Sequence, residues 1–277
     1  MKFKMHHKSV QRFLTVLMSF ALIVSLTAGY TAKAATGTID DKQLLNSEVI
    51  KDAALLAQLK ALTKEAMGGT VDDNEITVKN LIQKVTGDIV VNGDVKDISG
   101  IGYVRNASSI DLSQCEVSQI NDNEFEDCNM TKIILPTTVT RIGKEAFKNC
   151  SQLASISLKD ADSEGLRYIT YIGDNAFSNC SKLNDDTVNS MKDTVEYLGA
   201  NAFSSCTSIT SAKVPVITGE EGKQMVPANL FSGCTSLTKV KLCDDKIVRV
   251  DDGAFGYTGE LSFALKDDTY GDKLPST

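Results

Sequence analysis

The sequence predicts an α/β repeat solenoid, a curved array of short parallel strands and short helical segments behind an N-terminal helical cap. Three observations predict this fold class. Phenylalanine followed three residues later by cysteine recurs at intervals averaging about 26 residues, a period typical of solenoids. After most of these cysteines, apolar and polar residues alternate, as in a strand with one buried face. Before the repeats, apolar residues recur at the spacing of an amphipathic helix.

The chain begins with the pattern of a secretory signal peptide. Basic residues lie between Lys2 and Arg12, the apolar run Phe13–Leu26 follows, and small residues precede Ala35. This order is typical of a leader that is cleaved, here between Ala34 and Ala35. The apolar run is too short for a comfortable membrane span. We therefore expect a secreted or cell-surface protein that has no membrane insertion after cleavage.

Composition limits the function further. The whole chain has a net charge of −7, and without the five basic residues of the leader 24 basic side chains remain against 36 acidic ones, a net of −12. Such a surface repels phosphates, so we expect no nucleic-acid partner. Both histidines, His6 and His7, lie in the leader. Without imidazole the rest of the chain cannot build a Ser-His-Asp or Cys-His arrangement, and we expect no enzyme, cofactor or metal site.

The repeat contains more than the phenylalanine and the cysteine. The repeated pairs are Phe125/Cys128, Phe147/Cys150, Phe177/Cys180, Phe203/Cys206 and Phe231/Cys234, and a sixth copy has Phe255 with Thr258 in place of cysteine. An aliphatic residue lies five residues before each phenylalanine and is followed by a turn-type residue. Each repeat is therefore predicted to be a strand, a variable connection, a turn and a short helical segment that carries Phe and Cys.

The pattern I/V-G-x-x-A-F-x-x-C-x-x-L-x-x-I/V-x-L occurs in nearly complete form at Ile142–Leu158 and Leu198–Val214. The segment Ala107–Val117 fits the general leucine-rich repeat consensus, with Cys115 at its Asn/Cys position. Over about residues 103–265 the chain thus resembles the BspA-like leucine-rich repeat family of bacterial surface proteins. This resemblance implies surface display and adhesion to a protein ligand, such as a host or extracellular-matrix protein.

The segment before the repeats is predicted to be helical. Apolar residues from Leu45 to Leu62 predict an amphipathic helix that ends at Gly68-Gly69, and a second helix is predicted over Val78–Val85 after Thr77 as N-cap. Such a cap would cover the open end of a solenoid. The predicted organisation is a signal peptide (1–34), a cap (35–88), a solenoid of about six to seven coils (89–265) and a tail (266–277).

The tail ends in Leu274–Thr277, which resembles the start of a wall-sorting signal. Wall anchoring is therefore one interpretation of the C-terminus. The glycine, the apolar run and the basic residues of a complete signal do not follow.

The repeated cysteines allow three interpretations. Free structural thiols are favoured, because unpaired cysteine behaves as a small buried hydrophobe and Thr258 replaces it in one copy. Disulfides are the alternative in an exported protein, but the cysteines number seven, and coils about 4.8 Å apart exceed the usual Cβ separation of about 3.8 Å. Metal or catalytic use is least favoured. Cys243 follows a strand and is the candidate exposed thiol.

Outward-facing strand positions are the candidate binding residues, because the strand-lined concave face of a solenoid usually binds the partner. The candidates are Ser155, Ser157, Thr187, Ser211, Lys213, Lys239 and Lys241. Ordinary solubilising side chains are the competing interpretation. After Cys180 the strand pattern is interrupted by Asp186, and we expect a looser coil there.

Together these features predict an exported, non-catalytic module for protein binding and adhesion at the bacterial cell surface. The alternative is a structural or spacing module of a cell-envelope assembly. A hidden enzyme ranks third, because no carboxylate pair or nucleophile stands out from the repeats.

Overall fold

The structure is a computed structural model, and it describes residues 33–34, 37–38, 42–159, 165–192, 195–215, 217–218, 224–242 and 249–264. All of these belong to one compact unit, Ala32–Thr277. Most of the predicted signal peptide, the candidate thiol Cys243 and the predicted tail lie outside the described residues. Among the described helices, none is long and apolar enough to cross a membrane.

Two helices precede the coils, α2 (Ala53–Ala66) and α3 (Val78–Lys84). The expected start of the first helix near Leu45 is wrong, because the Asp52 side chain accepts hydrogen bonds from two backbone N–H groups and caps the helix there. Leu45 is nevertheless buried, in a segment that bonds to Ile76 O. The second helix is confirmed, with Thr77 as N-cap.

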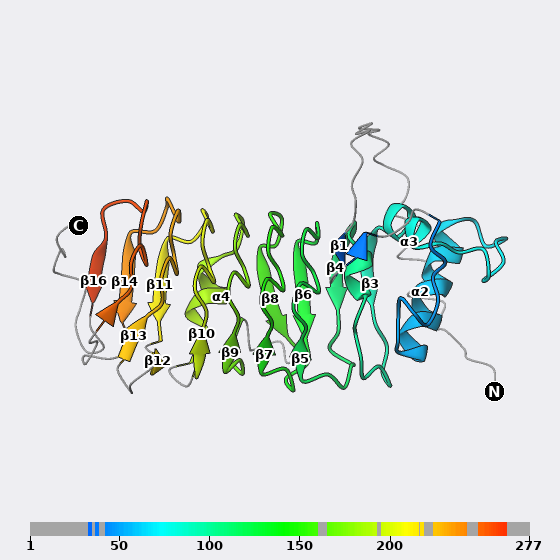
Figure 1. Ribbon diagram of the computed structural model, residues 1–277, viewed down its shortest axis with the longest axis horizontal. Helices are drawn as coiled ribbons and strands as arrows, with labels where there is room; N and C mark the ends of the chain where they lie inside the picture. The colour runs from blue at the N-terminus through cyan, green and yellow to red at the C-terminus, as the bar shows by residue number, and fades with distance from the viewer. Residues whose placement is uncertain are drawn as a thin grey trace. The chain divides into compact units, whose positions relative to one another are not determined.

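Side chains of α2 and of its N-cap residue, Asp52, take the place of a strand at the start of the solenoid. Asp52 Oδ2 accepts hydrogen bonds from Lys96 N and Asp97 N at 2.9 and 3.3 Å. Gln58 exchanges two bonds with the backbone of Asn92, at 2.9 and 3.1 Å. These bonds satisfy backbone groups that an uncovered first coil would leave unpaired. Figure 1 shows both helices beside β3 and β4.

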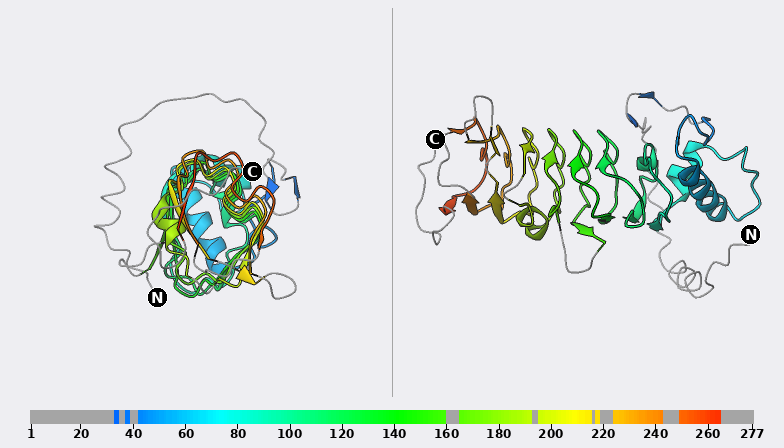
Figure 2. Two further views of the ribbon diagram at one scale, coloured as in Figure 1. Left: turned by 90° about the vertical axis from the view of Figure 1, so that its left-hand side faces the viewer. Right: turned by 90° about the horizontal axis from the view of Figure 1, so that it is seen from below.

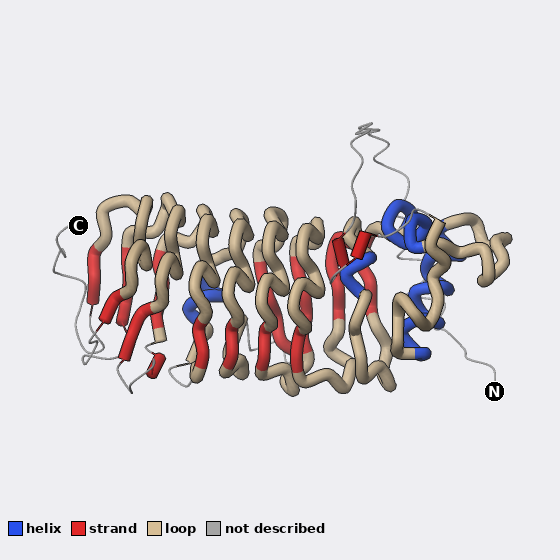
Figure 3. The backbone as a smooth tube through the Cα atoms, viewed as in Figure 1, coloured by secondary structure: helices blue, strands red, loops and turns tan. Residues whose placement is uncertain are grey.

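The coils build two sets of short strands, coloured red in Figure 3. The first set runs β3 (Gly87–Val90), β4 (Ala107–Asp111), β6 (Lys132–Leu135), β8 (Ser155–Leu158) and then β11 (Ser211–Val214), β14 (Lys239–Leu242), β16 (Ser262–Ala264). The second runs β5 (Gln119–Ile120), β7 (Arg141–Ile142), β9 (Tyr171–Ile172), β10 (Tyr197–Leu198) and then β12 (Ile217–Thr218), β13 (Gln224–Val226), β15 (Arg249–Val250).

Pairing between coils is parallel, except for the β12–β13 hairpin. A separate antiparallel pair joins β1 (Lys33–Ala34) to β2 (Gly37–Thr38), and a 3-10 turn, η1, spans Ile101–Tyr103. Equivalent residues lie in register, so that Ile133 pairs with Ile156 and both are buried. The solenoid fold class is therefore confirmed.

The first set of strands is interrupted by a helix, α4 (Asp185–Asn189), which lies between β8 and β11. The expectation of a looser coil at this place is wrong. Asn184 caps the helix, and Thr187 inside it is buried with Oγ1 accepting a hydrogen bond from Ile156 N at 3.3 Å. On the β8 side, a side chain thus replaces a strand partner.

On the β11 side, α4 uses side chains in the same way. Asp185 Oδ1 accepts from Thr210 N at 2.7 Å, and Asn189 Oδ1 accepts from Lys213 N at 2.6 Å. Carboxylate and amide oxygens here stand where strand carbonyls would be. The interruption therefore leaves these edge N–H groups paired.

The segment that carries Phe and Cys is not helical, which corrects the sequence-based expectation. Around Phe147 the backbone forms successive turns, and Glu145 and Asn149 have positive φ values of 56° and 62°. A helix would direct every N–H along its own axis. In this segment alternate N–H groups leave the coil, as in Phe147 N to Ala176 O at 2.8 Å, while those between them close turns inside it.

This arrangement repeats along the solenoid. In each coil from Phe125 to Phe231, the N–H groups of the phenylalanine and of the residues two before and two after donate to the next coil. The two flanking positions have positive φ in every copy, and asparagine, aspartate or glycine occupies most of them. We call this array the inter-coil ladder. All of its N–H groups point toward the C-terminal end.

The phenylalanine side chains stack inside the coils. Ring centroids from Phe125 to Phe231 are separated by 5.2 to 5.5 Å with nearly parallel planes, and these five rings are fully buried. Phe255 continues the stack at 6.1 Å but is only partly buried, and Phe263 meets it edge-on. The end view in Figure 2 shows the coils superposed around this interior.

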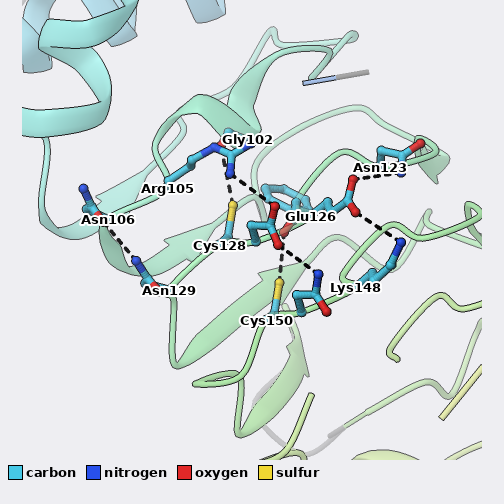
Figure 4. Close-up of polar contacts among 12 residues, drawn as sticks. Gly102, Arg105, Asn106, Asn123, Glu126, Cys128, Asn129, Lys148 and Cys150 are labelled. Carbon is cyan, nitrogen blue, oxygen red and sulfur yellow. Dashed lines mark hydrogen bonds and ion pairs between the residues drawn. The ribbon is translucent and has the colours of Figure 1, made fainter. Parts of the chain in front are cut away.

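Each cysteine of the Phe–Cys pairs joins its coil to the preceding one. Cys150 Sγ donates to Phe125 O at 2.9 Å, and Cys180 Sγ donates to Phe147 O at 3.0 Å. Cys206 and Cys234 make the same contact, and Cys128 reaches Gly102 O at 3.5 Å (Figure 4). The buried thiol is thus both a small apolar group and a weak donor.

Close approach between coils explains a repeated glycine. Gly173 follows the aliphatic residue of its repeat, and a Cβ there would lie 2.5 Å from Lys144 N in the preceding coil. Its φ is not in the left-handed region, so space rather than conformation requires glycine at this position.

We predict that Gly173→Ala lowers the free energy of unfolding by about 1 to 3 kcal/mol, because the added methyl group meets backbone that has to shift. Chemical denaturation followed by circular dichroism measures the change. Gly93→Ala is the matched control, since its Cβ would lie 3.8 Å from Gln114 O, an ordinary contact. Equal stability of the two variants would contradict the packing explanation.

Glu124 is an exception in the repeat. It stands immediately before Phe125, where the other copies have alanine or leucine. Its carboxylate accepts hydrogen bonds from Gly100 N at 2.8 Å and Asn121 Nδ2 at 2.9 Å. Burial raises the pKa of Glu124 to about 7; bonds from Asn121, Gly100 and Gly102 lower it, and nearby Asp97 raises it.

Because the folded pKa of Glu124 lies above the usual 4.5, the folded state binds more protons between pH 4.5 and 7. We predict that the free energy of unfolding falls by about 3 kcal/mol relative to Glu124→Gln as pH rises through this window. Urea unfolding of both proteins at a series of pH values checks the difference. A pH-independent difference would show that the carboxylate does not titrate there.

Candidate functional site

The outward positions of β6 and β8 form the first part of the predicted binding surface. Lys132 pairs with Ser155, and Ile134 pairs with Ser157. Both serines are half-buried, and their neighbours Ile156 and Leu158 point into the core. The alternation of the strand therefore places these hydroxyls on the outer face.

Thr187 is the one predicted binding residue that the structure removes from this surface. Its side chain is 1% exposed and lies inside α4, where Oγ1 also donates to Asn184 Oδ1 at 2.7 Å. The strand periodicity expected there is absent because Asn184 starts a helix. The helix separates the serines of β8 from the remaining candidates.

The second part of the surface lies on β11 and β14. Ser211 pairs with Lys239, and Lys213 pairs directly with Lys241. Lys239 is exposed and the other three are half-buried. Lys213 and Lys239 also have interactions with other residues. The candidate residues thus form two separate groups, rather than the single continuous array that the sequence suggested.

An open hollow of about 420 Å³ lies beside the carboxyl ends of β4, β6 and β8. Its lining is Ser113, Gln114, Cys115, Glu116, Val117, Ser118, Pro136, Thr137, Thr138 and Lys159. None of the predicted binding residues lines it. Thr138 donates to Val117 O at 2.6 Å, and Glu116 pairs with Lys96 at 3.4 Å, so several of its polar groups have partners within the chain.

The described thiols are poorly suited to chemistry. All six are free and buried. Burial raises the pKa of Cys128, Cys180 and Cys206 well above the usual value, and that of Cys234 to about 12. A thiol has to ionise before it attacks a substrate or binds a metal. These side chains therefore belong to the core.

The described residues contain no group of three His, Cys, Asp or Glu side chains that could hold a metal ion. The acidic stretch before α3 has local roles. Asp72 Oδ1 accepts from Asn74 N at 2.9 Å, and Asp73 pairs with Lys64 at 3.1 Å. Such contacts are those of a solvated turn.

The second set of strands carries a surface that sequence reasoning missed. The Arg141 guanidinium carbon lies 3.6 Å from the centroid of the Tyr171 ring. Tyr171 stacks on Tyr197 with centroids 4.5 Å apart and planes within 10°. These three residues, which we call the Arg–Tyr stack, come from the consecutive strands β7, β9 and β10.

The signal for this stack was present in the sequence. Each of its residues stands immediately before the aliphatic residue of its repeat, namely Ile142, Ile172 and Leu198. The aliphatic residues are buried, so their predecessors face outward. These two-residue strands are too short to show an alternating pattern of their own, unlike the strands after the cysteines.

Comparisons with known proteins agree with this repeat architecture. The model of the BspA type leucine rich repeat region matches residues 103–169 and 118–262, in six copies. A leucine rich cell surface protein from Faecalibacterium prausnitzii is 31% identical, with a TM-score of 0.44 over 53% of this chain and 36% of that one. The chain thus spans about a third of that protein.

Two further solved structures are more distant. A leucine rich repeat protein of T. pallidum is 22% identical, with a TM-score of 0.36 over 64% of this chain and 78% of that one. A leucine-rich repeat protein of Bacteroides ovatus is 15% identical, with a TM-score of 0.26 over 66% and 71%. No curated protein matches the chain significantly. Because the matched repeats cover more than half of its length, the chain belongs to the BspA-type leucine-rich repeat family.

Proposed function

We propose that this protein is an exported, non-catalytic adhesion module that binds a protein ligand at the bacterial cell surface. Family membership supports this proposal, since repeat proteins of this type offer extended side-chain arrays on a rigid scaffold. The similar protein from Faecalibacterium prausnitzii is described as a cell surface protein. The basic and apolar start of the chain supports export.

The Lys213–Lys241 pair is the observation that carries the proposal. The two residues lie directly opposite each other on adjacent parallel strands, and Lys239 lies two residues before Lys241 on the same outer face of β14. Like charges in directly opposed positions destabilise a sheet. A cluster of this kind on the outer face of an acidic chain is complementary in charge to an acidic partner surface.

Ser211 extends this lysine cluster on the side of α4. Its hydroxyl donates to Asp185 Oδ2 at 3.0 Å, and Asn189 Nδ2 donates to it at 3.2 Å. These bonds fix the edge of the surface. Ser155 and Ser157, beyond the helix, would supply hydrogen bonds to a ligand large enough to cross α4.

We expect the Lys213/Lys239/Lys241 triple alanine variant to bind immobilised extracellular-matrix proteins at least tenfold more weakly than the wild type, because three cationic contacts are lost together. Surface plasmon resonance against fibronectin, laminin and collagen would measure the affinities. Binding should also weaken as salt concentration rises, since the contacts are exposed.

A triple alanine variant of Lys51, Lys60 and Lys84 is the matched control. It removes the same charge from the helical cap and its start, away from the strand face. Equal loss in both variants would assign the effect to net charge and contradict the strand-face proposal. Absence of wild-type binding to every immobilised protein would favour a spacing role in the cell envelope.

A further inference from the structure

The Arg–Tyr stack holds its guanidinium in one orientation. The Arg141 guanidinium carbon lies over the Tyr171 ring, and Tyr197, from the strand on the other side of β9, stacks on that ring. Stacking on an aromatic face restricts a flexible side chain before any ligand arrives. The planar fork of N–H donors is then free to point away from the core, since Ile142 beside it is buried. This geometry suits a carboxylate, which accepts two parallel bonds from guanidinium.

Arg141 has no carboxylate partner among the described residues. The ion pairs there involve other cations, such as Arg105 with Asp127 and Lys148 with Glu126 and Glu145. Arg141 is half-buried and stacked on Tyr171, and among the described residues its N–H donors have no carboxylate acceptor. These oriented N–H donors are therefore the feature of the stack that suits an acidic ligand.

Asp174 contacts the stack, and its carboxylate already accepts hydrogen bonds from other groups of the chain. Asp174 Oδ1 accepts hydrogen bonds from the Tyr197 hydroxyl at 3.1 Å and from Ala200 N at 3.0 Å. The bond from its hydroxyl fixes Tyr197, which is 38% exposed. Glu196 precedes it and is exposed. The stack thus offers donors at Arg141 and a fixed aromatic edge at Tyr197.

We propose that the Arg–Tyr stack binds an extended acidic peptide segment of a partner protein, with a carboxylate of the segment on the Arg141 guanidinium. In an extended peptide, side chains on one face repeat about every 7 Å. A carboxylate at Arg141 therefore brings the next side chain on that face over the edges of Tyr171 and Tyr197.

A peptide fits this surface better than a glycan does. Sugar rings are bound by lying flat on an open aromatic face, but Tyr171 is covered by Arg141 on one face and by Tyr197 on the other. At Tyr171 the stack therefore leaves the ring edge available, and Tyr197 is 38% exposed. The partial positive charge of ring edges favours oxygen-rich partners, such as peptide carbonyls and carboxylates.

This surface is separate from the lysine cluster of the proposed function. The stack lies on β7, β9 and β10, which belong to the second set of strands, whereas the lysines lie on β11 and β14 of the first. The proposal does not depend on the strand face binding anything. One protein would then hold two partner segments on two faces of its coils.

The test uses a fluorescein-labelled hexapeptide of alternating glutamate and valine, with glutamine replacing glutamate in the neutral probe. Binding is measured by fluorescence anisotropy on the full chain carrying the Lys213/Lys239/Lys241 triple alanine change, so that the strand face cannot contribute. We expect the glutamate probe to bind at least tenfold more tightly than the glutamine probe. Arg141→Gln should weaken it about tenfold, as expected for one charge-assisted contact.

Lys144→Gln is the matched control, because it removes the same charge from an exposed side chain three residues away. It should change the affinity less than twofold. Tyr171→Leu should weaken binding although the Arg141 charge is retained, because the ring that orients the guanidinium is lost. Equal affinity for the two peptides, or no effect of Arg141→Gln in a folded variant, would overturn the proposal. Binding of an oligogalacturonate in place of the glutamate peptide would assign the surface to acidic glycans and overturn it too.

Discussion

The inter-coil ladder is the constraint on which the rest of the structure depends. At each Phe–Cys segment, alternate N–H groups donate to the following coil while the others close turns within their own. The segment can do so only where residues flanking the phenylalanine adopt positive φ. Stacking of the rings at 5.2 to 5.5 Å is a consequence of this spacing, as is the bond from each cysteine to a phenylalanine carbonyl of the coil before.

Where the ladder or a strand pair stops, side chains take over the role of the backbone. Asp52 and Gln58 do this at the N-terminal helix, and Thr187, Asp185 and Asn189 do it at α4. The physical reason is the same at both places, because a buried edge with unpaired N–H or C=O groups would cost free energy. Polar residues that break the repeat pattern are therefore part of the solution to an interruption, rather than defects.

Backbone groups of the coils are hydrogen-bonded to neighbouring coils, and one face of the strands is buried in the core. Binding therefore depends on the side chains of the outer face. The outward positions of the two sets of strands are then free to vary. One set gathers lysines on β11 and β14, and the other stacks an arginine on two tyrosines. Both arrangements place positive charge on a chain whose net charge is negative. Contacts with these local groups, rather than the electrostatic field of the whole protein, would therefore select a partner.

The sequence by itself determined the solenoid, the positions of its buried columns and the second cap helix, because each of these follows from local periodicity and capping. It did not reveal α4 or the turn conformation at Phe147. Those depend on which groups of neighbouring coils need hydrogen-bond partners. Likewise, Thr187 became a core residue and Arg141 came to stack on Tyr171 only when coils about 30 residues apart in the chain came into register. Contacts of that range are decided by tertiary structure, since no local pattern encodes them.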